Sequence, residues 1–135
     1  MRKYLFIGFG GFLGASLRMM IKGADIFSSV GFPLATLLIN LLGTFLLAFF
    51  LTLTLDFIKM DQDLKLSLSV GFFGSFTTFS TFSKEFSHLM FDENYYFATF
   101  YLLFSIIFGL LCAYAGLKIA NYIVANLGQT ERKEI

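Results

Sequence analysis

The sequence predicts an all-α integral membrane protein with four transmembrane helices. Of its 135 residues, 57% are hydrophobic and only 14% are charged, well below the share typical of soluble domains. Four long apolar runs follow one another, and each is long enough to cross a hydrocarbon core of ~30 Å as a helix. The connections between these runs are short and polar. We therefore expect residues 1–135 to form one transmembrane unit.

The first predicted span covers residues 4–21 and follows two basic residues. This arrangement is also typical of a signal peptide. However, Gly8, Gly11, Gly14 and Arg18 are spaced by three, three and four positions, so they share one face of a helix. A packing face favours a retained transmembrane helix, because a removable signal peptide has nothing to pack against.

The second predicted span covers residues 33–57, and Pro33 is expected in its first turn, where a missing N–H costs little. Small or polar residues recur at every fourth position along it: Thr36, Asn40, Thr44 and Ala48. Helix packing explains most of this stripe. It explains Asn40 less well, because a carboxamide near the middle of a membrane is costly without a partner or a pathway.

The third predicted span, residues 64–90, contains the stretch GSFTTFSTFS at positions 74–83. Glycine weakens a helix, and threonine hydroxyls compete for backbone groups, so a break at 74–77 is one interpretation. Unwound backbone at membrane depth is tolerated only inside protein or beside a cavity, where freed carbonyls could hold a cation. An unbroken helix whose glycines merely pack fits the pattern equally well.

A helix that starts near Phe79 would carry its side chains in three stripes. These are Phe79, Phe82 and Phe86; Ser80, Ser83 and Ser87; and Thr78, Thr81 and Glu85. A lipid-facing surface needs no hydroxyl groups, so two of the stripes are expected to face protein or water. The edge of a phenylalanine ring carries partial positive charge and could attract an anion along a narrow path.

The fourth predicted span covers residues 95–124 and is followed by a polar tail that we expect to fray. Its stripe of small or polar residues is Tyr101, Ser105, Gly109 and Ala113. Glycines in transmembrane helices usually allow close packing, and we expect this role for five of them. They are Gly8, Gly11, Gly43, Gly109 and Gly116.

The basic residues give the chain little preference for one orientation. Near the spans, four lie on the side of the N-terminus and three on the other side. The four are Arg2, Lys3, Lys59 and Lys65, and the three are Arg18, Lys22 and Lys84. A chain so balanced could insert in both directions, and two oppositely oriented copies could pair in the membrane.

The sequence argues against an enzyme and against nucleic-acid binding. It has no paired carboxylates, no nucleophile beside a base and no metal-ligand cluster, and its net charge is only +1. The single cysteine, Cys112, excludes an internal disulfide.

Three motifs, in their order and spacing, resemble the CrcB/Fluc fluoride channel family over almost the whole chain. They are GGFLGASLR (Gly10–Arg18), TLLINLLGTF (Thr36–Phe45) and GFFGSFTTFSTFSKE (Gly71–Glu85). The resemblance implies an antiparallel, dual-topology homodimer with two pores, inserted in the bacterial inner membrane, and a broken third helix. Small departures are Ser75, where many relatives have glycine, and Met19, where an aromatic residue is frequent.

The resemblance also implies the site residues. Main-chain carbonyls of Gly74 and Thr77 from each subunit would hold a structural sodium ion at the centre of the dimer. The pore residues it implies are Asn40, Phe79, Phe82, Tyr101 and Ser105, and Glu85 matches an acidic position of the family. Hydroxyls of Thr78 or Ser80 are further candidate donors to fluoride, and Arg18 could pair with carbonyls at the break or at a helix end.

The leading hypothesis is a passive fluoride channel that exports fluoride from the cytoplasm and relieves its toxicity. The alternative is a small, dual-topology, proton-coupled exporter of organic cations. That mechanism requires a carboxylate inside the membrane, and Glu85 is the only candidate. A structural or assembly protein is a third hypothesis, but such a protein would not need Asn40 together with the polar stripes of the third span.

Overall fold

The structure is a computed structural model that describes residues 1–24, 31–56 and 58–131. All regular elements in these ranges are helical, so the all-α prediction is confirmed. In chain order they are α1 (Arg2–Gly23), α2 (Leu34–Asp56), α3 (Gln62–Leu66), the π-helix η2 (Ser67–Phe73), α4 (Gly74–Phe76), α5 (Phe79–Phe91) and α6 (Tyr95–Glu131).

Three of the four predicted spans are single helices. Within the described ranges, α1, α2 and α6 are long and apolar enough to cross a membrane. The third predicted span is instead a row of shorter segments, from α3 through η2 and α4 to α5. Phe57, the predicted end of the second span, and residues 132–135 of the predicted frayed tail lie outside the described residues, whereas residues 128–131 of that tail belong to α6, so the expected fraying is wrong there. Pro33 directly precedes α2, and its carbonyl accepts the Leu37 N–H.

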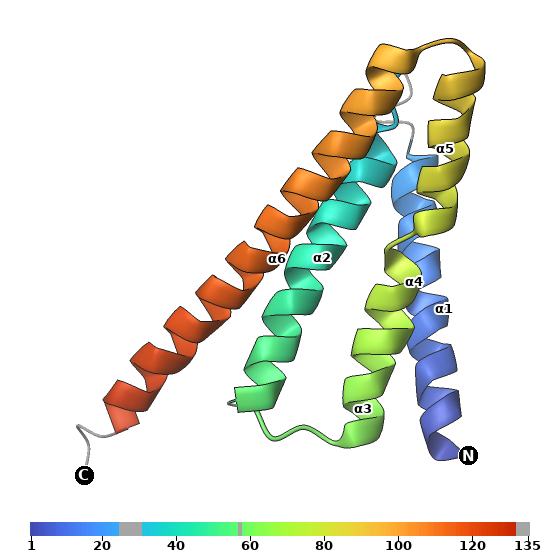
Figure 1. Cartoon of the computed structure of the whole chain (residues 1–135). Coiled ribbons are helices and arrows are strands. Elements are labelled where there is room, and N and C mark those ends of the chain that lie inside the picture. The colour runs from blue at the N-terminus through green and yellow to red at the C-terminus, as the bar shows by residue number, and fades with distance from the viewer. Residues whose placement is uncertain (25–30, 57, 132–135) are drawn as a thin grey trace.

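The helical runs alternate in direction, as Figure 1 shows. The chain ascends through α1, descends through α2, ascends through α3, η2, α4 and α5, and descends again through α6. The two main packed pairs are α1 with η2 and α2 with α6. Met1, the α2–α3 connection and the end of α6 therefore lie at the same end of the molecule, as expected for an even number of crossings.

The packing of α1 against η2 depends on glycines that bring two backbones together. A Cβ atom at Gly10 would collide with the Ser67 carbonyl, and one at Gly14 would collide with the Phe72 carbonyl. The Ser67 hydroxyl also donates to the Phe6 carbonyl of α1 at 2.6 Å. Gly14 therefore packs closely, as expected for its face of α1, whereas Gly8 has open space around it in the described single chain, so its packing role remains a prediction.

The other predicted packing glycines also differ in the space that a Cβ atom would have. Gly43 lies against Thr77 and Phe76, and a Cβ at Gly116 would meet the backbone of α2, so close packing is confirmed for these two. Gly11 contacts the Ser75 hydroxyl and also fits the prediction. Gly109 has no neighbour nearby in the described single chain, so its predicted packing role remains a prediction.

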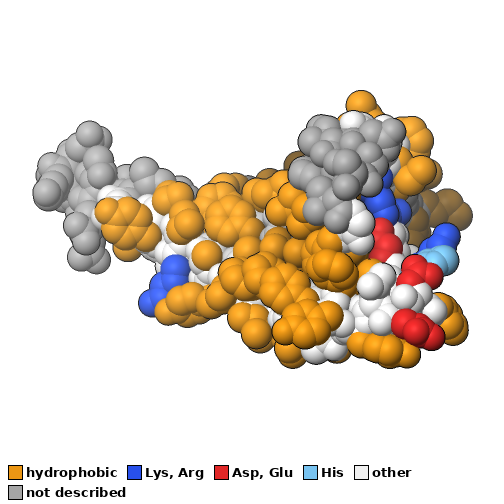
Figure 2. Space-filling view, turned by 90° about the horizontal axis from the view of Figure 1, so that it is seen from above, with side chains coloured by type: hydrophobic (Ala, Val, Ile, Leu, Met, Phe, Trp, Pro, Cys, Tyr) orange, Lys and Arg blue, Asp and Glu red, His pale blue; other side chains and the backbone are white. Residues whose placement is uncertain are grey.

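Hydrophobic side chains cover most of the surface. Figure 2 shows them over much of the described face that it presents, with most charged groups near one end and a separate basic group toward the other. On the long helices, exposed examples include Phe9, Phe12, Leu110 and Tyr114. Such an apolar exterior suits contact with lipid rather than with water.

Candidate functional site

The third helical run is broken at Thr77 and Thr78. Both residues have extended backbone, with φ and ψ of −72° and 156° at Thr77 and −149° and 120° at Thr78. Gly74 keeps helical angles of −65° and −29°. The predicted break is therefore confirmed, but it begins at the threonine pair, whereas the preceding segment that contains the glycine remains helical.

Asn40 holds the broken backbone with two hydrogen bonds. Its Nδ2 donates to the Thr78 carbonyl at 3.0 Å, and its Oδ1 accepts the Thr78 N–H at 2.8 Å. In a continuous α-helix, that N–H would bond to the Gly74 carbonyl four residues earlier. The carboxamide therefore replaces main-chain partners lost at the break, and this is the partner that a buried amide required.

Thr78 also begins α5. Its hydroxyl accepts the Thr81 N–H at 3.2 Å, as an N-cap does, and it lies 3.1 Å from the Thr81 hydroxyl and 3.3 Å from that of Ser80. The break is thus stabilised from both sides, by Asn40 and by this cap. The N-terminus of a helix carries partial positive charge, which favours a nearby anion.

An open groove of about 420 Å³ lies beside the break, between α2, α5 and α6. It is lined by Asn40, Thr44, Thr77, Thr78, Phe79, Phe82, Leu102, Ser105 and Ile106. Five of the predicted pore residues meet there: Asn40, Thr78, Phe79, Phe82 and Ser105. Its lining combines phenylalanine rings, hydroxyls and a carboxamide.

The predicted phenylalanine stripe is confirmed. Phe79 and Phe82 have ring centroids 5.9 Å apart, and those of Phe82 and Phe86 are 6.2 Å apart. Phe82 also packs on Tyr101 of α6 at 4.8 Å. Phe79 is 80% exposed in the single chain, so one side of the groove is formed by a ring that no other described residue of this chain covers.

The hydroxyl of Ser105 has a partner within its own helix. It donates to the Tyr101 carbonyl at 2.6 Å, so its proton is engaged and its oxygen remains an acceptor. Ser80 is exposed next to the Thr78 hydroxyl. Neither Ser80 nor Tyr101 lines the groove, and their predicted contact with the ion remains a prediction.

Glu85 is the centre of a polar network one helical turn beyond the groove. Its Oε1 accepts from Lys22 Nζ at 2.7 Å and from the Thr36 hydroxyl at 2.8 Å. Its Oε2 accepts from the Tyr101 hydroxyl at 3.0 Å. Thr36 and Tyr101 are fully buried.

Lys22 was not among the site residues predicted from the sequence. Two signals could have found it: Lys22 lies four positions after Arg18, and Glu85 needed a counter-charge. Arg18 is half-buried, and no ion pair or carbonyl contact is found for it within the described residues. The contact with the break that was expected of Arg18 is thus made by Asn40 instead.

The end of α4 offers main-chain oxygens for a cation. In the described part of the chain, no cluster of three or more His, Cys, Asp or Glu side chains could hold a metal. The last four carbonyls of a helix lack intrahelical partners, and α4 ends at Phe76, just before the break. The predicted ligands Gly74 and Thr77 belong to this turn, and Gly74 is exposed on the single chain. These neutral oxygen donors fit an alkali cation better than a transition metal.

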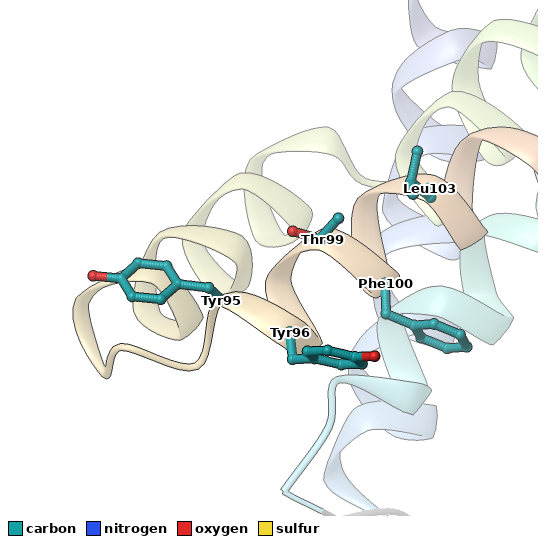
Figure 3. A pocket seen from close by; sticks show the side chains of 5 residues that line it. All are labelled: Tyr95, Tyr96, Thr99, Phe100 and Leu103. Atoms are coloured by element: carbon teal, nitrogen blue, oxygen red, sulfur yellow. The ribbon is translucent and has the colours of Figure 1, made fainter.

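A second hollow, of about 380 Å³, lies at the start of α6 and is seen in Figure 3. It is lined by Tyr95, Tyr96, Thr99, Phe100 and Leu103. Its surface is mostly apolar, and tyrosines near a helix end are typical of the membrane–water interface. This hollow is therefore unsuited to an anion, unlike the groove at the break.

Known proteins resemble this chain over most of its length. The sequence matches the family described as CrcB-like protein, Camphor Resistance (CrcB), over residues 5–117. A protein of Chlorobium phaeobacteroides, named fluoride-specific ion channel FluC, is 40% identical over 117 residues, which are 87% of this chain and 91% of that protein. A protein of the same name from Oceanobacillus iheyensis is 42% identical over 122 residues, 90% of this chain and 94% of that protein. A Staphylococcus aureus relative, FluC 1, is 37% identical over 119 residues, 88% and 97% of the two chains.

Proposed function

The chain belongs to the CrcB-like protein family, and on that premise we propose that it forms a passive, fluoride-selective channel. It lets fluoride leave the cytoplasm and thereby relieves fluoride toxicity. It is not an enzyme, because its relatives are ion channels. The observation that carries the proposal is the groove where Asn40, the N-terminus of α5 and the rings of Phe79 and Phe82 meet.

The groove has the groups that a small, strongly hydrated anion needs. The Asn40 side-chain nitrogen donates one of its two hydrogens to the Thr78 carbonyl. Its second hydrogen can be donated to an anion. The first amides of α5 have no intrahelical carbonyl partner, although the Thr78 hydroxyl accepts that of Thr81, and the positive end of the helix lies at Thr78 and Phe79, which line the groove. Ring edges attract the ion weakly enough for it to leave again. Larger halides are excluded by the width of the path and by their poorer fit to these donors.

The working unit of the channel is an antiparallel homodimer in which each subunit crosses the membrane four times. The exposed ring of Phe79 and the open side of the groove support this proposal, because a second copy would cover both. The near-equal distribution of basic residues supports insertion in both orientations. The bacterial inner membrane is its proposed location, and the relatives named above come from bacteria.

A sodium ion at the centre of this dimer would be held by the main-chain carbonyls of Gly74 and Thr77 from each subunit. Its role is structural: a buried cation would join the two breaks, and its field would favour an anion nearby. The exposure of Gly74 supports the proposal, because the second subunit could supply the remaining oxygen ligands there.

Removal of sodium is expected to weaken the dimer. A ligand that binds only the folded dimer stabilises it by about 2.7 kcal/mol when present at ~100 times its Kd. We therefore expect a lower melting temperature and more monomer when sodium is replaced by N-methylglucamine at equal ionic strength. Thermal melting and size-exclusion chromatography in detergent would measure this effect. Identical melting curves in the two buffers would contradict the central ion.

The alternative, a proton-coupled exporter of organic cations, fits the site less well. That mechanism needs a carboxylate that exchanges a proton for a cationic substrate. Glu85, the candidate, already has Lys22 at 2.7 Å and two hydroxyl donors. A cation would have to displace this lysine, so the network favours the anion channel.

The direct test is efflux from proteoliposomes that contain the purified protein. Vesicles loaded with fluoride are expected to release it rapidly once valinomycin carries a compensating potassium current, as read with a fluoride electrode. The control is the same experiment with chloride and a chloride electrode, for which release should match that of protein-free vesicles. Equal release of the two halides would refute a fluoride-selective channel.

A further inference from the structure

Glu85 raises an electrostatic problem for an anion channel. It lies three residues after Phe82, one turn along α5 from the groove. Its hydrogen-bond partners continue the same pattern: Thr36 precedes Asn40 by four residues, and Tyr101 precedes Ser105 by four. The carboxylate therefore stands at the end of the groove, where its negative charge would repel an approaching anion.

We propose that Lys22 is a positioning residue that cancels the charge of Glu85 and keeps this end of the groove passable to fluoride. The inference rests on the proposed function and adds a residue outside the site predicted from the sequence. Lys22 Nζ lies 2.7 Å from Glu85 Oε1. The Thr36 and Tyr101 hydroxyls also donate hydrogen bonds to the carboxylate, but they are neutral and do not cancel its charge. The lysine is thus the only cation that contacts Glu85 among the described residues.

The position of Lys22 suits a role in permeation more than a role in folding. In the single chain its side chain is 31% exposed and that of Glu85 is 23% exposed, so the pair is not sealed inside the subunit. A partly exposed pair contributes less to stability than a fully buried one. Its charges nevertheless set the local potential, and such a potential changes the rate at which ions enter a narrow path.

The network also joins all parts of the subunit at this end. Lys22 comes from α1, Thr36 from α2, Glu85 from α5 and Tyr101 from α6. Loss of the lysine would leave a charged carboxylate held in place by two neutral hydroxyls. The expected consequence is a fixed negative charge at the end of the groove rather than a collapsed helix bundle.

The experiment compares three variants with the wild type in fluoride efflux from proteoliposomes. Lys22→Gln should lower the rate about three- to tenfold at low ionic strength, because it leaves one uncompensated charge. Lys22→Arg keeps the charge and should retain most of the rate. Lys84→Gln is the matched control: Lys84 neighbours Glu85 in sequence, is exposed and has no ion pair within the described chain, so its removal should leave the rate nearly unchanged.

Salt dependence separates an electrostatic role from a structural one. Adding an impermeant salt screens exposed charges, so the deficit of Lys22→Gln should shrink as ionic strength rises. The deficit should also be smaller in a Glu85→Gln background than in the wild-type background, which a double-mutant cycle measures.

Each result bears on the proposal. A Lys22→Gln rate equal to that of the wild type at low ionic strength would overturn it, as would a deficit that salt and Glu85→Gln leave unchanged. If Lys22→Gln fails to form dimers, Lys22→Arg and Lys22→Met replace it in the test. A dimeric Lys22→Arg variant that loses its fluoride efflux would overturn the proposal. A Lys22→Arg variant that keeps its efflux, together with a Lys22→Met deficit that shrinks as ionic strength rises, would support it. If vesicles with the wild-type protein release no fluoride, the proposed function and this inference fall together. If the wild-type protein conducts fluoride and Lys22→Gln conducts it at the same rate, only this inference falls.

Discussion

Replacing Asn40 with aspartate is expected to lower fluoride efflux by about 100-fold, because a full negative charge enters the proposed anion path. The structure adds a second reason. Asn40 donates to the Thr78 carbonyl and accepts from the Thr78 N–H. A carboxylate keeps the second bond but turns the first into a repulsive contact between two oxygens. The measurement is fluoride release from proteoliposomes, with dimer content checked by size-exclusion chromatography.

The matched control for Asn40→Asp is the same substitution at Asn94. This residue lies in the exposed connection before α6, and its carbonyl accepts the Ala98 N–H. Aspartate is as good as asparagine at the N-terminal end of a helix, so the control should conduct normally. Unchanged efflux in Asn40→Asp would remove this residue from the path. Loss of the dimer in that variant would instead indicate that the clamp on Thr78 dominates.

Replacing Phe82 with isoleucine is expected to lower efflux by about tenfold, because isoleucine keeps an apolar side chain but removes the positively polarised ring edge. Phe82 lines the groove and contacts the rings of Phe79 and Tyr101. Phe79→Ile should act in the same direction. Its ring is largely exposed in one subunit, so this variant also tests whether the second copy completes the path.

The control for the ring substitutions is Phe91→Ile. Phe91 is the last residue of α5 and is 85% exposed, away from the groove. It should conduct like the wild type, and all three variants should remain dimeric. Wild-type efflux in Phe79→Ile as well as in Phe82→Ile would refute the assignment of the phenylalanines to the pore.

Much of the fold could be predicted because it depends on local composition. The positions of α1, α2 and α6 follow from the apolar runs, each of which reaches the length that a bilayer requires, although α6 continues to Glu131, beyond the predicted end at residue 124. The phenylalanine stripe likewise follows from helical periodicity once α5 begins at Phe79. The motifs around Asn40 and Thr78 are specific enough to indicate the family by themselves.

Other features could not be predicted because they depend on which surfaces meet. Spacing placed Gly8 on the packing face of α1, but the contact with η2 rotates that face so that Gly10 and Gly14 are buried. The π-helix η2 was not predicted either. Its first residue, Ser67, bonds a carbonyl of α1 that lies 61 positions away in the chain.

Composition, periodicity and motifs were therefore sufficient to establish the class of protein and its family, and to predict its spans and the residues that could meet an anion. The packing of separate helices was needed to establish where the third helix opens and how the acidic residue is neutralised. The difference arises from distance along the chain: Asn40 reaches Thr78 across 38 positions, and Lys22 reaches Glu85 across 63. Periodicity reports only what neighbours within a few turns will do, whereas these hydrogen bonds exist only after separate helices have packed.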